Sequence, residues 1–209
     1  MTEPADSRPP GSVFLVDDDD SFRRSIARLL DLAGFPVRTF PSVGDFLVAH
    51  PKEECGCLLL DMRMPGPDGM ELLEHFHREQ TGPPVVFLTG HGEVPSAVEA
   101  MRKGAFDFLT KPVEKETLVE TVRKALRHAE EARSNARERT RLRERFSTLS
   151  PTERTIFRLV VDGLPNKAIA DETGLAERTV KLHRSNLSRK LGAQCVADLV
   201  RFRFEADLR

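Results

Sequence analysis

The chain has 209 residues, of which 39% are hydrophobic and 31% are charged, and its formal net charge is −1 at pH 7. This length allows one or two domains, each with a hydrophobic core. No window approaches 18 consecutive apolar residues, and the first residues lack the order of a secretory signal, so we expect a cytoplasmic protein that does not enter a membrane. The three cysteines show no CxxC spacing, which argues against a disulfide framework or a zinc site.

The small net charge hides an asymmetry along the chain. Residues 1–112 carry 11 Lys and Arg against 18 Asp and Glu, whereas residues 113–146 carry 10 against 7 and residues 147–209 carry 11 against 8. An acidic first half followed by two basic segments predicts two tasks in one chain. Residues 1–12 are polar and contain Pro9, Pro10 and Gly11, and we expect a disordered lead-in there.

Five short apolar runs alternate with helical patterns in the first half. The expected strands are 13–16, 37–40, 57–61, 85–88 and 106–109. The expected helices are 21–33, 43–49, 70–78 and 94–103, with a further helix from residue 114. A regular alternation of strand and helix predicts an α/β doubly wound parallel sheet.

Polar residues stand where these strands end, which is where ligands bind in parallel sheets. Asp17 and Asp18 follow the first strand, Asp61 ends the third, Thr89 follows the fourth and Lys111 follows the fifth. Such a set fits a carboxylate nucleophile for phosphoryl transfer, with Mg²⁺ on the acidic oxygens and with Lys and Thr on the phosphoryl group. Taken singly, an Asp after a strand is also a common turn cap, and a run of four Asp is also typical of a solvated loop.

Four segments resemble the receiver domain of two-component response regulators: 16–19, 59–65, 89–92 and 110–112. Residues 90–101 are similar to the FixJ subgroup in particular. The resemblance covers roughly residues 13–127 and implies a flavodoxin-like sheet of five strands in the order 2-1-3-4-5.

The same resemblance implies roles for single residues. Asp61 would be the phospho-acceptor, Thr89 and Lys111 would contact the phosphoryl group, and Phe108 would be the aromatic switch. The bond between Lys111 and Pro112 would be cis, and Asp19 and Asp20 would take no part. The implied ligands for Mg²⁺ or Mn²⁺ are Asp17, Asp18, Asp61 and the main-chain carbonyl of Arg63.

A long helical segment follows the expected sheet, because the chain has no Gly or Pro between Glu114 and Pro151. We predict one helix that continues to about residue 145, with residues 128–146 as a helical linker. A heptad seam of mostly small residues runs along it: Leu118, Val122, Ala125, Ala129, Ala132 and Ala136. Two copies could pair along this seam, and a single solvated helix fits the pattern as well.

The helical spacing of apolar residues in 147–209 predicts an all-α unit of four helices. Ser150, followed by Pro151 and Glu153, forms a capping box for a helix that ends at Asp162. Asn166 is expected to cap the next helix, and further helices are expected over 177–191 and 196–204. Two short helices, a turn and a longer basic helix are typical of a helix-turn-helix, although other helical bundles share the pattern.

Three segments of this unit resemble the LuxR-type DNA-binding domain, over about residues 147–205: 149–154, 163–170 and 178–187. In the implied recognition helix, Val180, Leu187 and Leu191 face the core. The residues that match base contacts are Lys181, Leu182 and Ser185. The candidate phosphate contacts are Lys167, Arg178, Thr179, Arg184, Asn186, Arg189 and Lys190. Ala176 stands where the family usually has a Ser or Thr cap, and the missing cap lowers the stability of this helix by about 1 kcal/mol.

Together the resemblances imply a response regulator of the FixJ type. A histidine kinase would phosphorylate Asp61, and the phosphorylated protein would dimerise, bind an inverted repeat of double-stranded DNA and contact RNA polymerase. It would be no enzyme beyond assisting its own phosphorylation and dephosphorylation. One rival is a haloacid-dehalogenase-like phosphatase, but such enzymes normally have a second Asp where this chain has Arg63. Another is an orphan regulator that binds DNA without phosphorylation, against which the complete set of five site residues argues.

Overall fold

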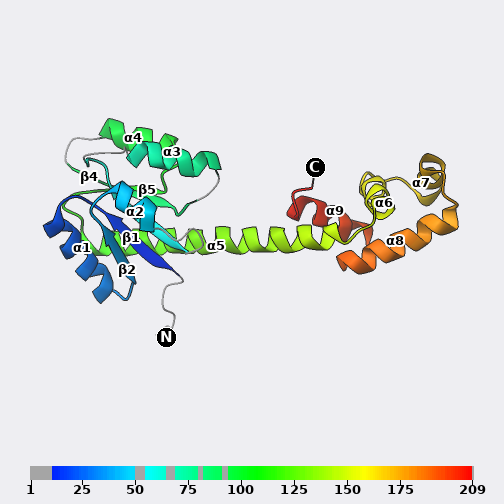
Figure 1. Cartoon of the computed structure of the whole chain (residues 1–209), viewed down its shortest axis with the longest axis horizontal. Coiled ribbons are helices and arrows are strands. Elements are labelled where there is room, and N and C mark those ends of the chain that lie inside the picture. The colour runs from blue at the N-terminus through cyan, green and yellow to red at the C-terminus, as the bar shows by residue number, and fades with distance from the viewer. Residues whose placement is uncertain (1–10, 50–54, 65–68, 80–81, 91–93, 209) are drawn as a thin grey trace. The chain divides into compact units, whose positions relative to one another are not determined.

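The computed structural model describes residues 11–49, 55–64, 69–79, 82–90 and 94–208 (Figure 1). The chain divides into two compact units, Met1–Arg133 and Ser134–Arg209, which are described separately below. Of the predicted lead-in over residues 1–12, only Gly11 and Ser12 lie within the described residues. Ser12 already belongs to the first strand, so the expected disorder is wrong at this residue.

A five-stranded sheet forms the centre of the first unit. Its strands are β1 (Ser12–Val16), β2 (Val37–Phe40), β3 (Gly56–Asp61), β4 (Val85–Thr89) and β5 (Asp107–Thr110). They lie in the order β2-β1-β3-β4-β5, and all neighbours are parallel, which confirms the predicted topology. All residues of β3 and β4 are buried, as expected for central strands that are covered on both faces.

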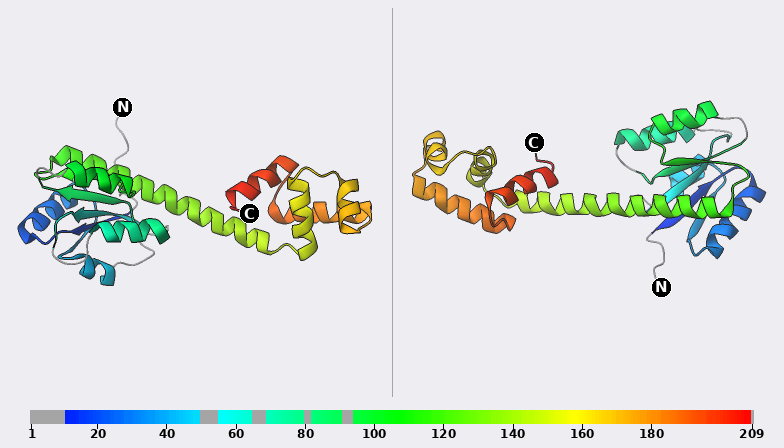
Figure 2. Two further views of the ribbon diagram at one scale, coloured as in Figure 1. Left: turned by 90° about the horizontal axis from the view of Figure 1, so that it is seen from above. Right: turned by 180° about the vertical axis from the view of Figure 1, so that it is seen from behind.

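Helices cover both faces of this sheet (Figures 1 and 2). The helices are α1 (Asp20–Leu32), α2 (Val43–Ala49), α3 (Gly69–Glu79), α4 (Val94–Arg102) and the first part of α5 (Lys115–Ser147). Leu59 of β3 lies in one core cluster with α1 and α5, whereas its neighbour Leu58 lies in the other cluster with α2, α3 and α4. Successive side chains of a strand point to opposite faces, so the two clusters are the two sides of the sheet.

The helix α5 is a single element of 33 residues that begins in the first unit and ends in the second. Its predicted heptad seam has two environments. Leu118, Val122 and Ala125 are fully buried in the core of the first unit, whereas Ala132 and Ala136 are exposed. Pairing of two copies along the whole seam is therefore excluded in this fold, because the first part packs against the protein's own sheet. In the portion of the chain that the structure describes, no helix has both the length and the apolar character needed to cross a bilayer.

The second unit contains the four predicted helices, α6 (Pro151–Val161), α7 (Asn166–Thr173), α8 (Glu177–Leu191) and α9 (Val196–Glu205). They share one core with the end of α5, to which Leu142 of α5 contributes. The capping box between Ser150 and Glu153 is present.

The expected cap of α7 is wrong. Asn166 is the first residue of that helix, and its N-cap is Pro165, which makes no side-chain cap bond. The side-chain oxygen of Asn166 instead accepts a hydrogen bond from the Arg184 guanidinium, and this contact explains why it does not fold back on the helix end.

Candidate functional site

The polar residues predicted at the strand ends meet at one edge of the sheet. Asp61 is the last residue of β3 and pairs with Leu88 of β4, while Thr89 pairs with Thr110 just before Lys111. One carboxylate oxygen from each of Asp17, Asp18 and Asp61 lies within 4.8 Å of the others. The sheet therefore brings together side chains that are far apart in the sequence, as the strand order requires.

Lys111 binds two of these carboxylates at once. Its Nζ lies 2.7 Å from Oδ2 of Asp17 and 2.9 Å from Oδ1 of Asp61. The same ammonium lies 4.2 Å from the centroid of the Phe22 ring, within the range of a cation–π interaction. Asp17 is fully buried and Asp61 is 7% exposed, so this cation compensates charges that water scarcely reaches.

Burial and neighbouring charge set the protonation of this cluster. Burial raises the pKa of Asp61, and the nearby Asp17 carboxylate adds to the increase, against the opposing effect of Lys111. Burial opposes the charge on Lys111, but its bonds to Asp17 and Asp61 outweigh this and raise its pKa. The three carboxylates thus form a site of concentrated negative charge, in which a further cation would be stabilised.

The remaining two residues of the acidic run, Asp19 and Asp20, serve the start of α1. The side chain of Asp19 accepts hydrogen bonds from the backbone N–H groups of Ser21 and Phe22, and these bonds lower its pKa. Asp20 forms ion pairs with Arg23 and Arg24. The sequence reasoning missed the capping role of Asp19, although an Asp just before a helical pattern is a recognised cap signal.

The other predicted receiver residues border this cluster. Thr89 is 2% exposed, and its hydroxyl donates to the carbonyl of Gly90 at 3.1 Å. The backbone N–H of Arg63 donates to the Asp61 carboxylate, which places the main chain of Arg63 beside that residue. Phe108 on β5 is 37% exposed. The bond between Lys111 and Pro112 is cis, as predicted.

In the second unit, α8 presents two different faces. Val180, Leu187 and Leu191 are buried in the core, as predicted from their spacing. The residues that match base contacts are all exposed: Lys181, Leu182 and Ser185. Leu182 is 60% exposed. The N-cap of α8 is Ala176, which makes no side-chain cap bond.

The candidate phosphate contacts fall into groups by exposure and by the bonds that they make. Arg189 donates to the side chain of Asn186 at 3.2 Å, and Arg184 donates to Asn166. Three of the candidates are exposed side chains outside the core: Lys167, Arg178 and Arg189. Three others are half-buried: Thr179, Arg184 and Asn186.

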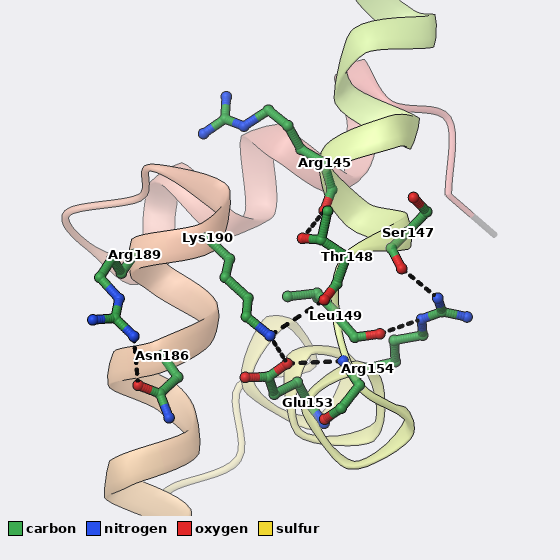
Figure 3. Close-up of polar contacts among 10 residues, drawn as sticks. Arg145, Ser147, Thr148, Leu149, Glu153, Arg154, Asn186, Arg189 and Lys190 are labelled. Atoms are coloured by element: carbon green, nitrogen blue, oxygen red, sulfur yellow. Dashed lines mark hydrogen bonds and ion pairs between the residues drawn. The ribbon is translucent and has the colours of Figure 1, made fainter.

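Lys190 differs from the other candidates because its ammonium is bound inside the unit (Figure 3). It lies 2.7 Å from Oε2 of Glu153 and donates to the carbonyl of Thr148 at 3.2 Å. Glu153 is 4% exposed, and its carboxylate also accepts from the backbone N–H of Ser150 at 2.8 Å. The bond from Lys190 is the main cause of the lowered pKa of Glu153. The sequence predicted only the local capping box, because nothing in a sequence pairs residues that far apart.

Comparison with known proteins identifies both units. Residues 13–123 match the response regulator receiver domain, and residues 147–203 match the bacterial regulatory proteins of the luxR family. The chain belongs to the two-component response regulators that join a receiver domain to a LuxR-type DNA-binding domain. A receiver domain implies a histidine kinase as partner, and a LuxR-type domain implies DNA.

Within this class the chain is a FixJ-like regulator. It is 40% identical over 198 residues to the transcriptional regulatory protein FixJ of Bradyrhizobium diazoefficiens, which covers 95% of this chain and 97% of that protein. The solved structure of the response regulator StyR matches with a TM-score of 0.80 and 42% identity, over 93% of this chain and 98% of that one. The structure of full-length FixJ from B. japonicum matches with a TM-score of 0.57 and 40% identity, over 95% of this chain and 98% of that chain.

Proposed function

We propose that Asp61 accepts a phosphoryl group from the phosphohistidine of a partner kinase and that this raises the DNA-binding activity of the second unit. The observation that supports the proposal is the cluster of Asp17, Asp18 and Asp61 with the shared Lys111 ammonium. A carboxylate oxygen of Asp61 attacks phosphorus, the bond from phosphorus to the imidazole nitrogen breaks, and an aspartyl phosphate forms. When water attacks the phosphorus of the aspartyl phosphate, the bond from phosphorus to the Asp61 oxygen breaks, inorganic phosphate leaves and the carboxylate is restored.

The donor set fits Mg²⁺ or Mn²⁺, since both prefer carboxylate and carbonyl oxygens. Asp17, Asp18, Asp61 and the main-chain carbonyl of Arg63 would hold the ion, which when bound neutralises charge on the phosphoryl oxygens. Lys111 moves from its bond with Asp61 to a phosphoryl oxygen, and the Thr89 hydroxyl donates to another. When the Thr89 hydroxyl breaks its hydrogen bond to the Gly90 carbonyl, the side chain of Phe108 turns inward.

The output of phosphorylation is a dimer that presents two α8 helices to an inverted repeat. Exposed Lys181, Leu182 and Ser185 read base edges, while the cations around them contact phosphates and set the register. We assign Lys190 a supporting role instead, because its ammonium already neutralises Glu153. The proposed DNA binding implies a protein that acts in the cytoplasm and has RNA polymerase as a further partner at the promoter.

The test measures phosphorylation and DNA binding on the full chain. With acetyl phosphate and MgCl₂, wild type gains the mass of one phosphoryl group and binds a fluorescent promoter fragment more tightly. The variant Asp61→Asn shows neither change. The matched control is Asp20→Asn, because Asp20 belongs to the same acidic run but pairs with arginines of α1.

Two outcomes would contradict the proposal. If wild type gains no mass and binds DNA as Asp61→Asn does, the protein is a regulator that works without phosphorylation. If the purified protein turns over a phosphate ester and Asp61→Asn does not, it is a phosphatase.

A further inference from the structure

A cavity in the second unit lies away from the recognition face. It has a volume of about 700 Å³, and its walls come from the end of α5, from α6 and from the residues at the end of α9. Cavities that hold small ligands in proteins have roughly 300–1,000 Å³. The cavity is therefore large enough for a molecule of one or two rings.

The cavity combines cations with aromatic rings. Four arginines line it, against a single carboxylate, that of Asp207: Arg143, Arg154, Arg158 and Arg203. Arg143 is paired with Asp207 and Arg203 with Asp162, so the excess positive charge comes from Arg154 and Arg158. The apolar part of the wall comes from the half-buried side chains of Phe146 and Leu208. Behind Phe146 lies the ring of Phe157, which is only 1% exposed and meets Phe146 edge to face with centroids 5.2 Å apart. An excess of positive charge beside an apolar surface favours a ligand that has an apolar body and an anionic group.

The guanidinium groups keep donors for such a ligand. Arg154 donates through Nε and Nη2 to the carbonyls of Leu149 and Ser147. Arg143 likewise uses Nε and Nη2, for the carbonyl of Ala206 and the side chain of Asp207. These bonds fix the side chains, and since a guanidinium has five N–H groups, each retains donors. Among the described residues, the Arg158 guanidinium has no hydrogen bond or ion pair, although it lines the same cavity.

We propose that this cavity binds a small aromatic anion, with the ring system against Phe146 and Leu208 and the carboxylate or sulfonate on Arg158. Such a ligand touches α5, α6 and the chain after α9 together, so that it braces the end of α5 against the DNA-binding unit. A DNA backbone is the less suitable partner, because phosphates offer no apolar body for Phe146 and Leu208. The proposal does not depend on phosphorylation of Asp61.

The probe is 1-anilinonaphthalene-8-sulfonate, whose fluorescence rises in apolar sites, titrated into the full chain. The protein contains no Trp and no Tyr, so its own emission does not interfere. We expect saturable binding at one site per chain and an increase of the unfolding temperature with probe concentration. The neutral analogue N-phenyl-1-naphthylamine should bind far more weakly, since it has the rings without the sulfonate.

The substitutions Arg158→Gln and Arg158→Glu should weaken probe binding about tenfold or more, the value of one charged hydrogen bond. Neither should unfold the protein, which circular dichroism checks. The matched control Arg141→Gln removes an exposed arginine of α5 that pairs only at 3.6 Å with Glu138 and does not line the cavity, and it should bind as wild type does.

The proposal fails if the wild type does not bind the probe, if the neutral analogue binds equally well, or if both Arg158 variants bind like wild type. It also fails if Arg158→Gln weakens DNA binding and leaves probe binding intact, because Arg158 is then a phosphate contact.

Discussion

Lys111 neutralises Asp17 and Asp61, two buried carboxylates that would otherwise repel each other. The raised pKa of Asp61 shows that burial and Asp17 together outweigh the lysine, so that the ionised site is under electrostatic stress. A bound divalent cation relieves that stress. A neutral side chain at position 61 relieves it as well.

We therefore expect MgCl₂ to stabilise wild type and not Asp61→Asn. At a concentration one hundred times the Kd the gain is about 2.7 kcal/mol in the free energy of unfolding. Without metal, Asp61→Asn should be the more stable of the two proteins. Urea unfolding with MgCl₂ and with EDTA measures both effects, and equal stabilisation of the two proteins by magnesium would show that the ion binds elsewhere.

Glu153 and Lys190 form the corresponding pair in the second unit, and this pair predicts a dependence of stability on pH. The pKa of Glu153 is lowered in the fold from 4.5, first by the bond from Lys190 and also by Ser150. A lowered pKa means that the stabilisation is present above pH 4.5 and is lost as the pH falls through the folded value. The Lys190 side chain is 36% exposed, so screening by solvent reduces the effect to roughly 1–2 kcal/mol.

The substitution Lys190→Met should thus destabilise the second unit at pH 7, and the difference from wild type should shrink below pH 4.5 as Glu153 takes up a proton. Thermal unfolding of both proteins from pH 7 to below pH 4.5 measures this difference in stability. Arg189→Gln is the control, because Arg189 binds only its neighbour Asn186 on the same helix. A difference that stayed constant with pH would assign the effect to packing instead.

At the scale of the elements, α8 begins without a side-chain cap. Ala176 has φ −67° and ψ 143°, the extended conformation that a capping Ser also adopts. Ala176→Ser should therefore raise the free energy of unfolding by about 0.5–1 kcal/mol, measured by urea titration. The same change at Ala132, exposed in the interior of α5, should be neutral or slightly unfavourable. Equal effects at the two positions would mean that the new hydroxyl does not cap α8.

The elements of this fold follow from short-range patterns, and the sequence therefore predicts them well. Each apolar run became a strand and the carboxyl-end residues came together, because strand order and parallel direction leave no other edge for them. The seam of α5 was ambiguous because a helix that packs on a sheet and a helix that packs on a second copy show the same period. The bonds from Lys190 to Glu153 and from Arg184 to Asn166 join distant residues, so no local pattern indicated them.

For the whole molecule, α5 is one continuous helix that crosses the boundary between the two units, and we predict that the response to phosphorylation depends on this continuity. Ser134 and Asn135 lie in this helix, are exposed and stand at the boundary of the two units. Changing both to Gly should cost about 0.5–1 kcal/mol of local helix stability, because Ser and Asn are themselves weaker helix formers than Ala. The gain in DNA affinity on phosphorylation should then fall, while the affinity of the unphosphorylated protein stays the same.

Fluorescence anisotropy with acetyl phosphate measures this gain. The double variant Ser134→Ala with Asn135→Ala keeps the helix and should respond as wild type does. If the glycine variant kept the full gain, the signal would pass by a route that does not need a stiff helix, such as simple tethering of two units.

Because Leu126 belongs to one core and Leu142 to the other, α5 also limits how this protein can recombine. A chimaera that takes its sensor half from one regulator and its output half from another must be spliced between these two leucines. A junction before Leu126 would remove part of the hydrophobic core of the first unit. A junction after Leu142 would remove part of the core of the second unit. Exchange of modules during evolution, or in the laboratory, is thus directed to the charged stretch of α5 between these two leucines.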